Sequence, residues 1–149
     1  DSDHGGLALR MHPNLRLAAR PDENIAARGQ ALNSEGVTAD AQAGTSGGPV
    51  WGKRARWIDY WGDVDGHTVG IALFDHPSNL RHPTHWMARG YGYVAACPFG
   101  LHSFDKAPAG TGDFVIPADG NATFRYRLVF HEGKPQDARV EQMWREYAK

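Results

Sequence analysis

The sequence predicts a mainly β fold, an antiparallel β-sandwich or part of a larger supersandwich, with one C-terminal helix. Three observations predict it: apolar and polar residues alternate in several short segments, 18 glycines and 9 prolines separate these segments, and only the C-terminus has a helical period. The 149 residues, 41% of them apolar and 22% charged, indicate a single globular domain.

The clearest pair of strands lies in residues 51–75. Trp57, Asp59 and Trp61 fall on one face of its first strand. Residues 62–66 are Gly, Asp and Val and turn the chain, after which the alternation resumes. We therefore expect a hairpin over this segment.

The other expected strands are weaker or shorter. They lie at residues 7–11, 91–97, 114–116 and 123–131. In the last of them, Phe124, Tyr126, Leu128 and Phe130 share one face, which we expect to join the core.

The C-terminal segment is the one convincing helix of the sequence. Pro135 suits the first helical position. A stripe at helical spacing follows it, formed by Val140, Met143, Trp144 and Tyr147. We expect this stripe to pack on a sheet.

Three regions are rich in turn-forming residues and lack the hydrophobic periodicity of a helix or a strand. Residues 20–50 are rich in Ala, Gly, Asn, Ser and Asp, which predicts a long loop or a ragged pair of strands. Residues 75–89 and 100–112 are expected to be loops because neither period is present in them.

Charge and composition exclude several classes of protein. The 16 basic and 17 acidic residues leave a net charge of -1, so no cationic field for nucleic acid is expected. No apolar run approaches the roughly 20 residues of a membrane span. Cys97 is the single cysteine, which excludes an intrachain disulfide, and we expect it to be a buried, inert thiol. The composition predicts a soluble chain. The first residues do not resemble a signal peptide, and the compartment stays open.

Three histidines lie within ten residues of each other: His76, His82 and His85. Neutral imidazoles at such spacing would suit a divalent metal as a cofactor. The alternative is structural, because a His-Pro dipeptide also fixes an extended loop backbone.

The same region is rich in aromatic and polar side chains that suit a saccharide or another polar small molecule. The candidate ligand-binding residues are Asn79, Arg81, Trp86, Arg89 and Tyr91. Aromatic rings cover the C–H faces of sugars while guanidinium and amide groups bond their hydroxyls. Packing in the core or at its rim is the alternative for the aromatic residues.

Candidates for acid–base catalysis are Asp59, His76, His85 and His131. Asp59 shares its strand face with two tryptophans. If that face is covered, burial raises the pKa of Asp59; if it is open, Asp59 is an ordinary solvated carboxylate.

Several segments together resemble the uncharacterised bacterial PmoA-like family, catalogued as methane oxygenase. The resemblance covers most of residues 51–149 and rests on Trp57-Ile58-Asp59-Tyr60, Asp65-Gly66, Thr68 to Ala72, Asp75-His76-Pro77-Ser78-Asn79, Trp86 with Arg89 and Tyr91-Gly92, Pro98-Phe99-Gly100, Arg125-Tyr126-Arg127 and His131-Glu132-Gly133. It implies that residues 1–149 form a single domain that is the C-terminal part of a longer family domain, similar to sandwich proteins that handle sugars.

The leading functional hypothesis is a soluble β-sandwich domain that binds or transforms a carbohydrate-like polar ligand. One alternative is a metal-dependent oxygenase or lyase that uses the histidine loop. Another is a structural half-domain that needs a partner chain, either a second copy or the missing N-terminal half.

Overall fold

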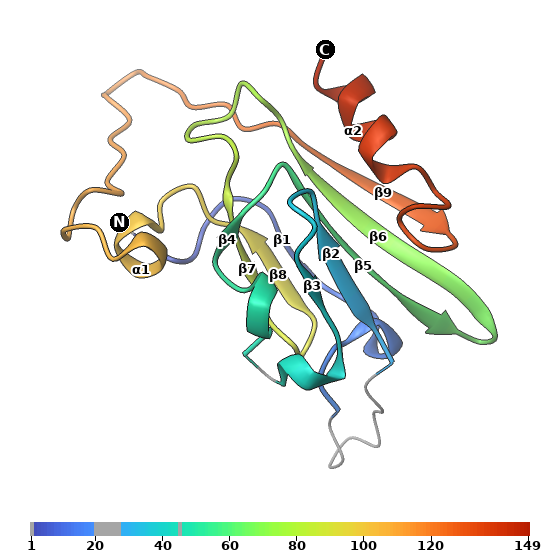
Figure 1. The fold of residues 1–149 in the computed structure, drawn as a ribbon. Coiled ribbons are helices and arrows are strands. Elements are labelled where there is room, and N and C mark those ends of the chain that lie inside the picture. Colours follow the sequence, from blue (N-terminus) through green and yellow to red (C-terminus); the bar gives the residue numbers. More distant parts are fainter. Residues whose placement is uncertain (1, 20–27, 45) are drawn as a thin grey trace.

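The computed structural model describes residues 2–19, 28–44 and 46–149, which form two antiparallel sheets (Figure 1). The smaller sheet has the strand order β1-β8-β7-β4, with bounds Ala8–Arg10, Tyr93–Ala96, His85–Ala88 and Lys53–Arg54. The larger sheet has the order β3-β2-β5-β6-β9, with bounds Thr38–Ala39, Gln30–Asn33, Trp57–Val64, His67–Asp75 and Tyr126–Glu132. The predicted mainly β fold with a C-terminal helix is confirmed.

The main core lies between the two sheets. The inner face of the larger sheet contributes Ile58, Tyr60 and Leu73, all with 0% exposure. The smaller sheet contributes Trp86 and Val94 from the opposite side. Burial of such side chains is the main stabilising contribution to a domain without disulfides.

Strands β5 and β6 form the predicted hairpin, with a register that runs from Trp57 opposite Phe74 to Val64 opposite His67. The turn itself is only Asp65-Gly66, shorter than the predicted 62–66. Both turn residues have positive φ, 54° and 83°, as a two-residue hairpin turn with the twist of the flanking strands requires. The strands therefore extend up to the turn.

Helix α2 (Val140–Tyr147) covers the outer face of the larger sheet. Val140 and Trp144 of the predicted stripe are buried against Trp57 and Phe74. The helix begins at Val140 and not at Pro135, because the chain turns between these residues and Arg139 adopts a left-handed conformation at the N-cap. The Trp57 indole N–H then donates to Glu141 Oε2 at 2.7 Å and fixes the first turn of the helix on the sheet.

Two elements lie where the sequence predicted loops. Strand β7 was missed because all four of its residues are buried, so it lacks alternation. The short helix α1 (Leu101–Asp105) covers the outer face of the smaller sheet, where Phe104 packs edge-on against Trp51 at 5.2 Å. Cys97 is buried beneath it, as predicted, and burial raises the pKa of its thiol to about 12.

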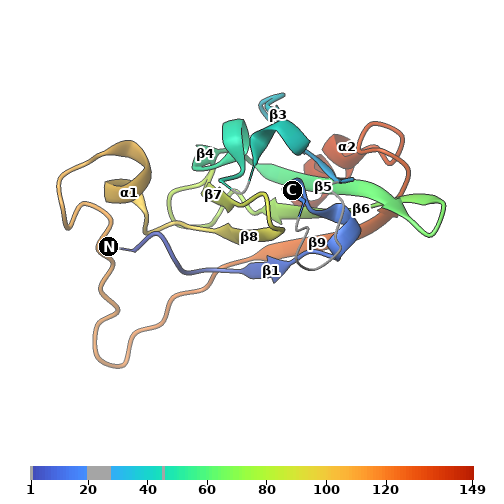
Figure 2. The ribbon, with the colours of Figure 1, turned by 90° about the horizontal axis from the view of Figure 1, so that it is seen from below.

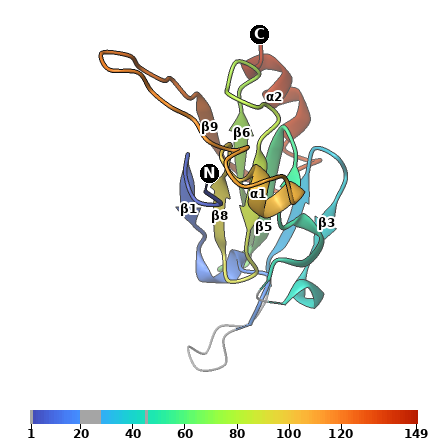
Figure 3. The same ribbon diagram turned by 90° about the vertical axis from the view of Figure 1, so that its left-hand side faces the viewer.

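The expected strand at 114–116 is absent. Phe114, Val115 and Ile116 are 41%, 81% and 51% exposed, and the chain between α1 and β9 projects from the sheets (Figure 1, Figure 2 and Figure 3). The segment lies away from the edges of both sheets. Its backbone N–H and C=O groups therefore have no neighbouring strand to pair with.

Strand β9 is an edge strand of the larger sheet, and its faces differ from the prediction. Phe130, expected in the core, is 74% exposed. It lies beside an apolar hollow of about 460 Å³ that Val64, Val69 and Ile71 also line. The smaller sheet does not cover this end of the inner face.

The loop-rich region contains the ragged strand pair that was one of its two expected forms. Ala31 pairs with Ala39, and three-residue 3-10 helices follow at Ala41–Ala43 and Gly48–Val50, while a similar one, Pro13–Leu15, precedes the region. The predictions for residues 20–27 lie outside the described residues. Among the helices that the structure describes, none has the length and apolar character needed to cross a membrane.

Candidate functional site

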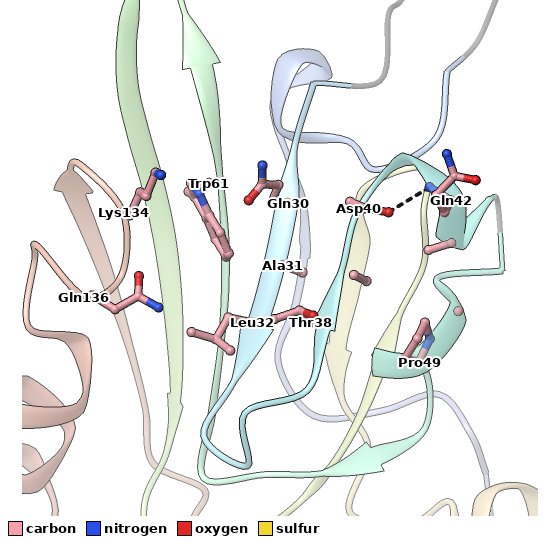
Figure 4. A pocket seen from close by; sticks show the side chains of 13 residues that line it. Gln30, Ala31, Leu32, Thr38, Asp40, Gln42, Pro49, Trp61, Lys134 and Gln136 are labelled. Carbon is pink, nitrogen blue, oxygen red and sulfur yellow. Dashed lines mark hydrogen bonds between the residues drawn. The ribbon is translucent and has the colours of Figure 1, made fainter.

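A groove of about 610 Å³ crosses the larger sheet at its β3 edge (Figure 4). We call it the Trp61 groove; its lining residues are Gln30, Ala31, Leu32, Thr38, Ala39, Asp40, Gln42, Ala43, Gly48, Pro49, Trp61, Lys134 and Gln136. These residues come from β2, β3, β5, the two 3-10 helices after β3 and the loop between β9 and α2. The groove therefore depends on the folded sheet and is not a local loop.

Trp61 is held in place by its strand. It pairs with Gln30 on one side and with Gly70 on the other, and its side chain lies on the outer face. A Cβ on Gly70 would lie 3.1 Å from the Trp61 Cβ, so glycine at this position leaves room for the indole. Trp61 is 7% exposed, which makes it a rigid contributor to the groove wall.

Polar side chains surround the indole. In Figure 4, Trp61 and Gln30 lie between Lys134 and Gln136 on one side and Asp40 and Gln42 on the other. Asp40 Oδ1 accepts a hydrogen bond from the Gln42 backbone N–H at 2.9 Å, which fixes the 3-10 turn there. The groove thus offers carboxamides, one carboxylate and one ammonium around one aromatic ring.

On the same sheet face as Trp61, the structure brings together two of the predicted catalytic residues, Asp59 and His131. His131 Nε2 lies 2.7 Å from Asp59 Oδ2, although the residues belong to β5 and β9. The His131 imidazole lies over Gly70 of β6. A Cβ built on Gly70 would lie 2.4 Å from the His131 Cε1. Leu32, a groove residue, is the strand partner of Asp59.

The two side chains of the Asp59–His131 pair are almost wholly buried. The side chains of Asp59 and His131 are 0% and 5% exposed. Asp59 Oδ1 has no hydrogen-bond partner within the described part of the chain. The covered-face alternative of the sequence analysis therefore applies to Asp59.

Burial and charge oppose each other in this pair. Burial raises the pKa of Asp59, and the hydrogen bond and positive charge of His131 reduce that rise. Burial alone would lower the pKa of His131, but the hydrogen bond and charge of Asp59 outweigh it and raise the pKa. His131 Nδ1 also lies 3.3 Å from the Glu132 carbonyl oxygen, so both ring nitrogens face acceptors and the geometry favours the imidazolium.

Asp75 is the centre of the predicted histidine loop. Its buried carboxylate accepts from the Asn79 Nδ2 amide at 2.7 Å, from His82 Nδ1 at 2.7 Å and from the Thr84 backbone N–H at 2.9 Å. Asn79 also bonds both backbone groups of Arg125, so it ties the loop to the start of β9. This predicted ligand-binding residue is buried in a structural network.

The three predicted metal-ligand candidates lie in three different environments. His82 bonds Asp75 and stacks parallel to Trp144 at 6.2 Å. His76 Nδ1 accepts from the Ser78 backbone N–H at 3.0 Å within its own turn. The rest of the described chain likewise holds no group of three or more His, Cys, Asp or Glu side chains that could bind a metal ion.

His85, a catalytic and metal candidate, is buried on β7. Its Nε2 bonds Asp105 Oδ1 of α1 at 2.8 Å, and its ring stacks on Phe104. Burial lowers the pKa of His85, and the Asp105 bond opposes this effect only in part. The contact attaches α1 to the smaller sheet.

The remaining predicted ligand-binding residues make contacts within the chain and do not line the Trp61 groove. Trp86 is 0% exposed and donates its indole N–H to the Ala55 carbonyl oxygen at 2.9 Å. Arg81 donates to the carbonyl oxygens of four residues, namely Pro98, Thr111, Gly112 and Asp113. Arg89 lies over the Trp51 ring, and Tyr91 lies under the Arg10 guanidinium.

None of the residues that line the Trp61 groove was among the sequence candidates. Gln30, Gln42 and Gln136 are isolated glutamines with no motif around them. The signal that was available is Trp61 itself, an aromatic residue on the outer face of the securest hairpin. The strand pairing of β2 with β5, which places Gln30 beside it, has no local sequence signature.

Comparison with known proteins gives one match. No curated protein and no solved structure matches the chain. The model of a family of unknown function, DUF6807, matches residues 1–145. Because this match covers nearly the whole chain, the protein belongs to the DUF6807 family.

Proposed function

We propose that this chain is a binding module for a carbohydrate-like polar ligand, which it holds in the Trp61 groove. The observation that carries the proposal is the combination of one indole with three carboxamides, from Gln30, Gln42 and Gln136, in one groove. Sugars present C–H faces to aromatic rings and hydroxyls to amides and charged groups. The carboxamides supply the polar partners, and the exposed part of the Trp61 indole supplies apolar surface together with Leu32 and Pro49.

The polar groups of the groove are available to a ligand. No hydrogen bond joins the side-chain amides of Gln30, Gln42 or Gln136 to another described residue. The groove volume of about 610 Å³ lies within the roughly 300–1,000 Å³ of small-molecule sites. One or a few sugar rings fit this size.

The residues that line the groove suit saccharide binding better than hydrolysis of a glycosidic bond. Its described lining contains one carboxylate, Asp40, whereas hydrolysis of a glycosidic bond ordinarily uses two. Asp59 and His131 do not line the groove and are almost wholly buried. We therefore assign the Asp59–His131 pair to the support of the groove wall.

The proposal is tested by screening a saccharide array and measuring the strongest hits by calorimetry. Gln136→Ala should weaken binding about tenfold, because it removes one amide from the groove. Gln142→Ala is the matched control: it removes an exposed glutamine of α2 that bonds only Glu146 and should leave the affinity unchanged. Absence of any saccharide hit, or equal affinities in both variants, would contradict the proposal.

A further inference from the structure

We propose that the saccharide bound in the Trp61 groove is acidic, and that its anionic group lies between Arg28 and Lys134. This inference rests on the proposed function and adds the class of the ligand. The argument comes from a second hollow that adjoins the groove.

The second hollow has a volume of about 140 Å³ and is lined by Arg28, Gln30, Trp61, Gly62, Asp63, Thr68 and Lys134. Gln30, Trp61 and Lys134 line the main groove as well, so the two hollows meet at these residues. A water molecule takes about 30 Å³ in the liquid. The smaller hollow therefore has room for a carboxylate or sulfate group but not for a second large ligand.

Arg28 is brought to this hollow by close backbone packing. The Gly29 backbone N–H donates to the Arg16 carbonyl oxygen at 3.0 Å. A Cβ on Gly62 would lie 3.1 Å from the Arg28 carbonyl oxygen and 3.2 Å from the Gly29 Cα. Glycine at position 62 thus lets the segment at Arg28 lie directly against β5.

Lys134 is brought there by the turn that follows β9. The Gly133 backbone N–H donates to the Thr68 carbonyl oxygen of β6 at 2.8 Å. The Lys134 backbone N–H donates to Asp137 Oδ2 at 3.2 Å, which holds the turn. The ammonium and the Arg28 guanidinium consequently belong to one hollow although they come from distant segments.

The charges of the described residues that line this hollow do not cancel. Two cations, Arg28 and Lys134, face one carboxylate, Asp63, whose Oδ1 already accepts from the Gly66 backbone N–H at 3.3 Å. Among the described residues, neither cation has an ion-pair partner. Both cations could therefore donate charge-assisted hydrogen bonds to a carboxylate or sulfate of the ligand.

The main groove carries opposite charges at its two ends. Figure 4 places Lys134 at one end and Asp40 at the other, with Trp61 and Gln30 between them. An anionic group at the Asp40 end would meet a like charge. The ligand therefore binds in one direction, with its anionic group beside Lys134 and neutral hydroxyls beside Asp40.

Calorimetry on matched pairs of ligands tests this inference. The probes are oligogalacturonate and its methyl ester, oligoglucuronate and the corresponding neutral glucose oligomer, and a galactose oligomer with and without sulfate. The wild-type chain should bind the acidic member of at least one pair about tenfold more tightly than the neutral member. The preference should shrink in high salt because exposed charges are screened.

Arg28→Ala is the decisive variant because Arg28 lines the smaller hollow and does not line the Trp61 groove. It should remove most of the preference for the acidic member, because only Lys134 then remains to pair with the anionic group. Lys53→Ala removes an exposed cation from the other sheet and should change neither affinity. A preference for sulfate over carboxylate also supports the anion site and identifies its ligand group.

Two results would overturn the inference, and they are distinguishable. If neutral and acidic members bind equally, or if Arg28→Ala keeps the preference, the acidic specificity is wrong while saccharide binding stands. If no member of any pair binds, saccharide binding itself fails, and the acidic specificity fails with it.

Discussion

His131 Nε2 and Asp59 Oδ2 lie 2.7 Å apart across Gly70, so one buried contact joins three neighbouring strands of the larger sheet. Leu32 and Trp61, both residues of the groove, adjoin Asp59 through strand pairing and along β5. The contact therefore supports the wall on which the proposed ligand site is built.

Gly70→Ala should break this contact. The new Cβ would lie 2.4 Å from His131 Cε1 and 2.5 Å from its Nε2, so the ring must move away from Asp59. We expect a loss of about 1–3 kcal/mol in the free energy of unfolding, measured with urea. Because His131 causes the clash, Gly70→Ala should cost much less in a His131→Ala background. Equal costs in both backgrounds would show that the alanine does not act through His131.

The pair should also make stability depend on pH. The pKa of His131 is raised in the folded chain, so folding favours its protonated form. This contribution is complete below about pH 6.5, the value of a free histidine, and is lost as the pH rises through the raised pKa. Urea unfolding of the wild type should therefore show a decline in stability as the pH rises above about 6.5 that His131→Gln lacks. Parallel pH profiles would contradict the raised pKa.

His85 should produce the opposite dependence. Its pKa is lowered by burial, so folding disfavours its protonated form, and its contribution is lost as the pH falls below about 6.5. His85→Gln should reduce the loss of stability between pH 7 and 5. Asp105→Asn should increase that loss, because the Asp105 bond is what partly restores the pKa. A smaller loss of stability in Asp105→Asn than in the wild type would show that the Asp105 bond does not raise the pKa of His85.

Asn79→Ala should destabilise the chain although Asn79 is not in the proposed site. The change removes its bonds to Asp75 and to the Arg125 backbone, and leaves buried polar groups unpaired. We expect a cost of about 1–3 kcal/mol in urea unfolding. Asn121→Ala, at an exposed position, is the control and should change stability by less than about 0.5 kcal/mol. Loss of saccharide binding without loss of stability would instead return Asn79 to a ligand-binding role.

Arg81→Gln should loosen the projecting chain between α1 and β9. The guanidinium holds carbonyl oxygens at Thr111, Gly112 and Asp113, and glutamine cannot span them. Limited proteolysis should cut residues 106–125 faster in this variant than in the wild type. Arg89→Gln, which removes only a contact over Trp51, should leave the cutting rate unchanged. Equal rates for Arg81→Gln and the wild type would show that Arg81 does not hold the segment.

The predictable parts of the fold were those with a local pattern. The β5–β6 hairpin alternates and has a two-residue turn, and the stripe of α2 has a helical period. Strand β7 is buried on both faces, so it has no alternation to detect. Phe130 was placed in the core because alternation identifies a face but does not show whether another sheet covers it.

The candidate site was less predictable because pairing between distant strands creates it. Asp59 was singled out for its two tryptophan neighbours, but its contact with His131 spans 72 residues of sequence. Gln30 reaches the groove only because β2 pairs with β5. Density of His, Arg and aromatic residues instead pointed to the loop around Asp75, where these side chains hold the backbone together.

Nuclear magnetic resonance with a bound saccharide tests the central claim most directly. The side-chain amide signals of Gln30, Gln42 and Gln136 are the reporters for the groove, and the amide of Gln142 on α2 is the internal control. The account predicts that a saccharide selected from the array shifts the three groove amides and leaves the Gln142 amide in place. Shifts confined to the loop around Asp75, with the groove amides unmoved, would contradict it.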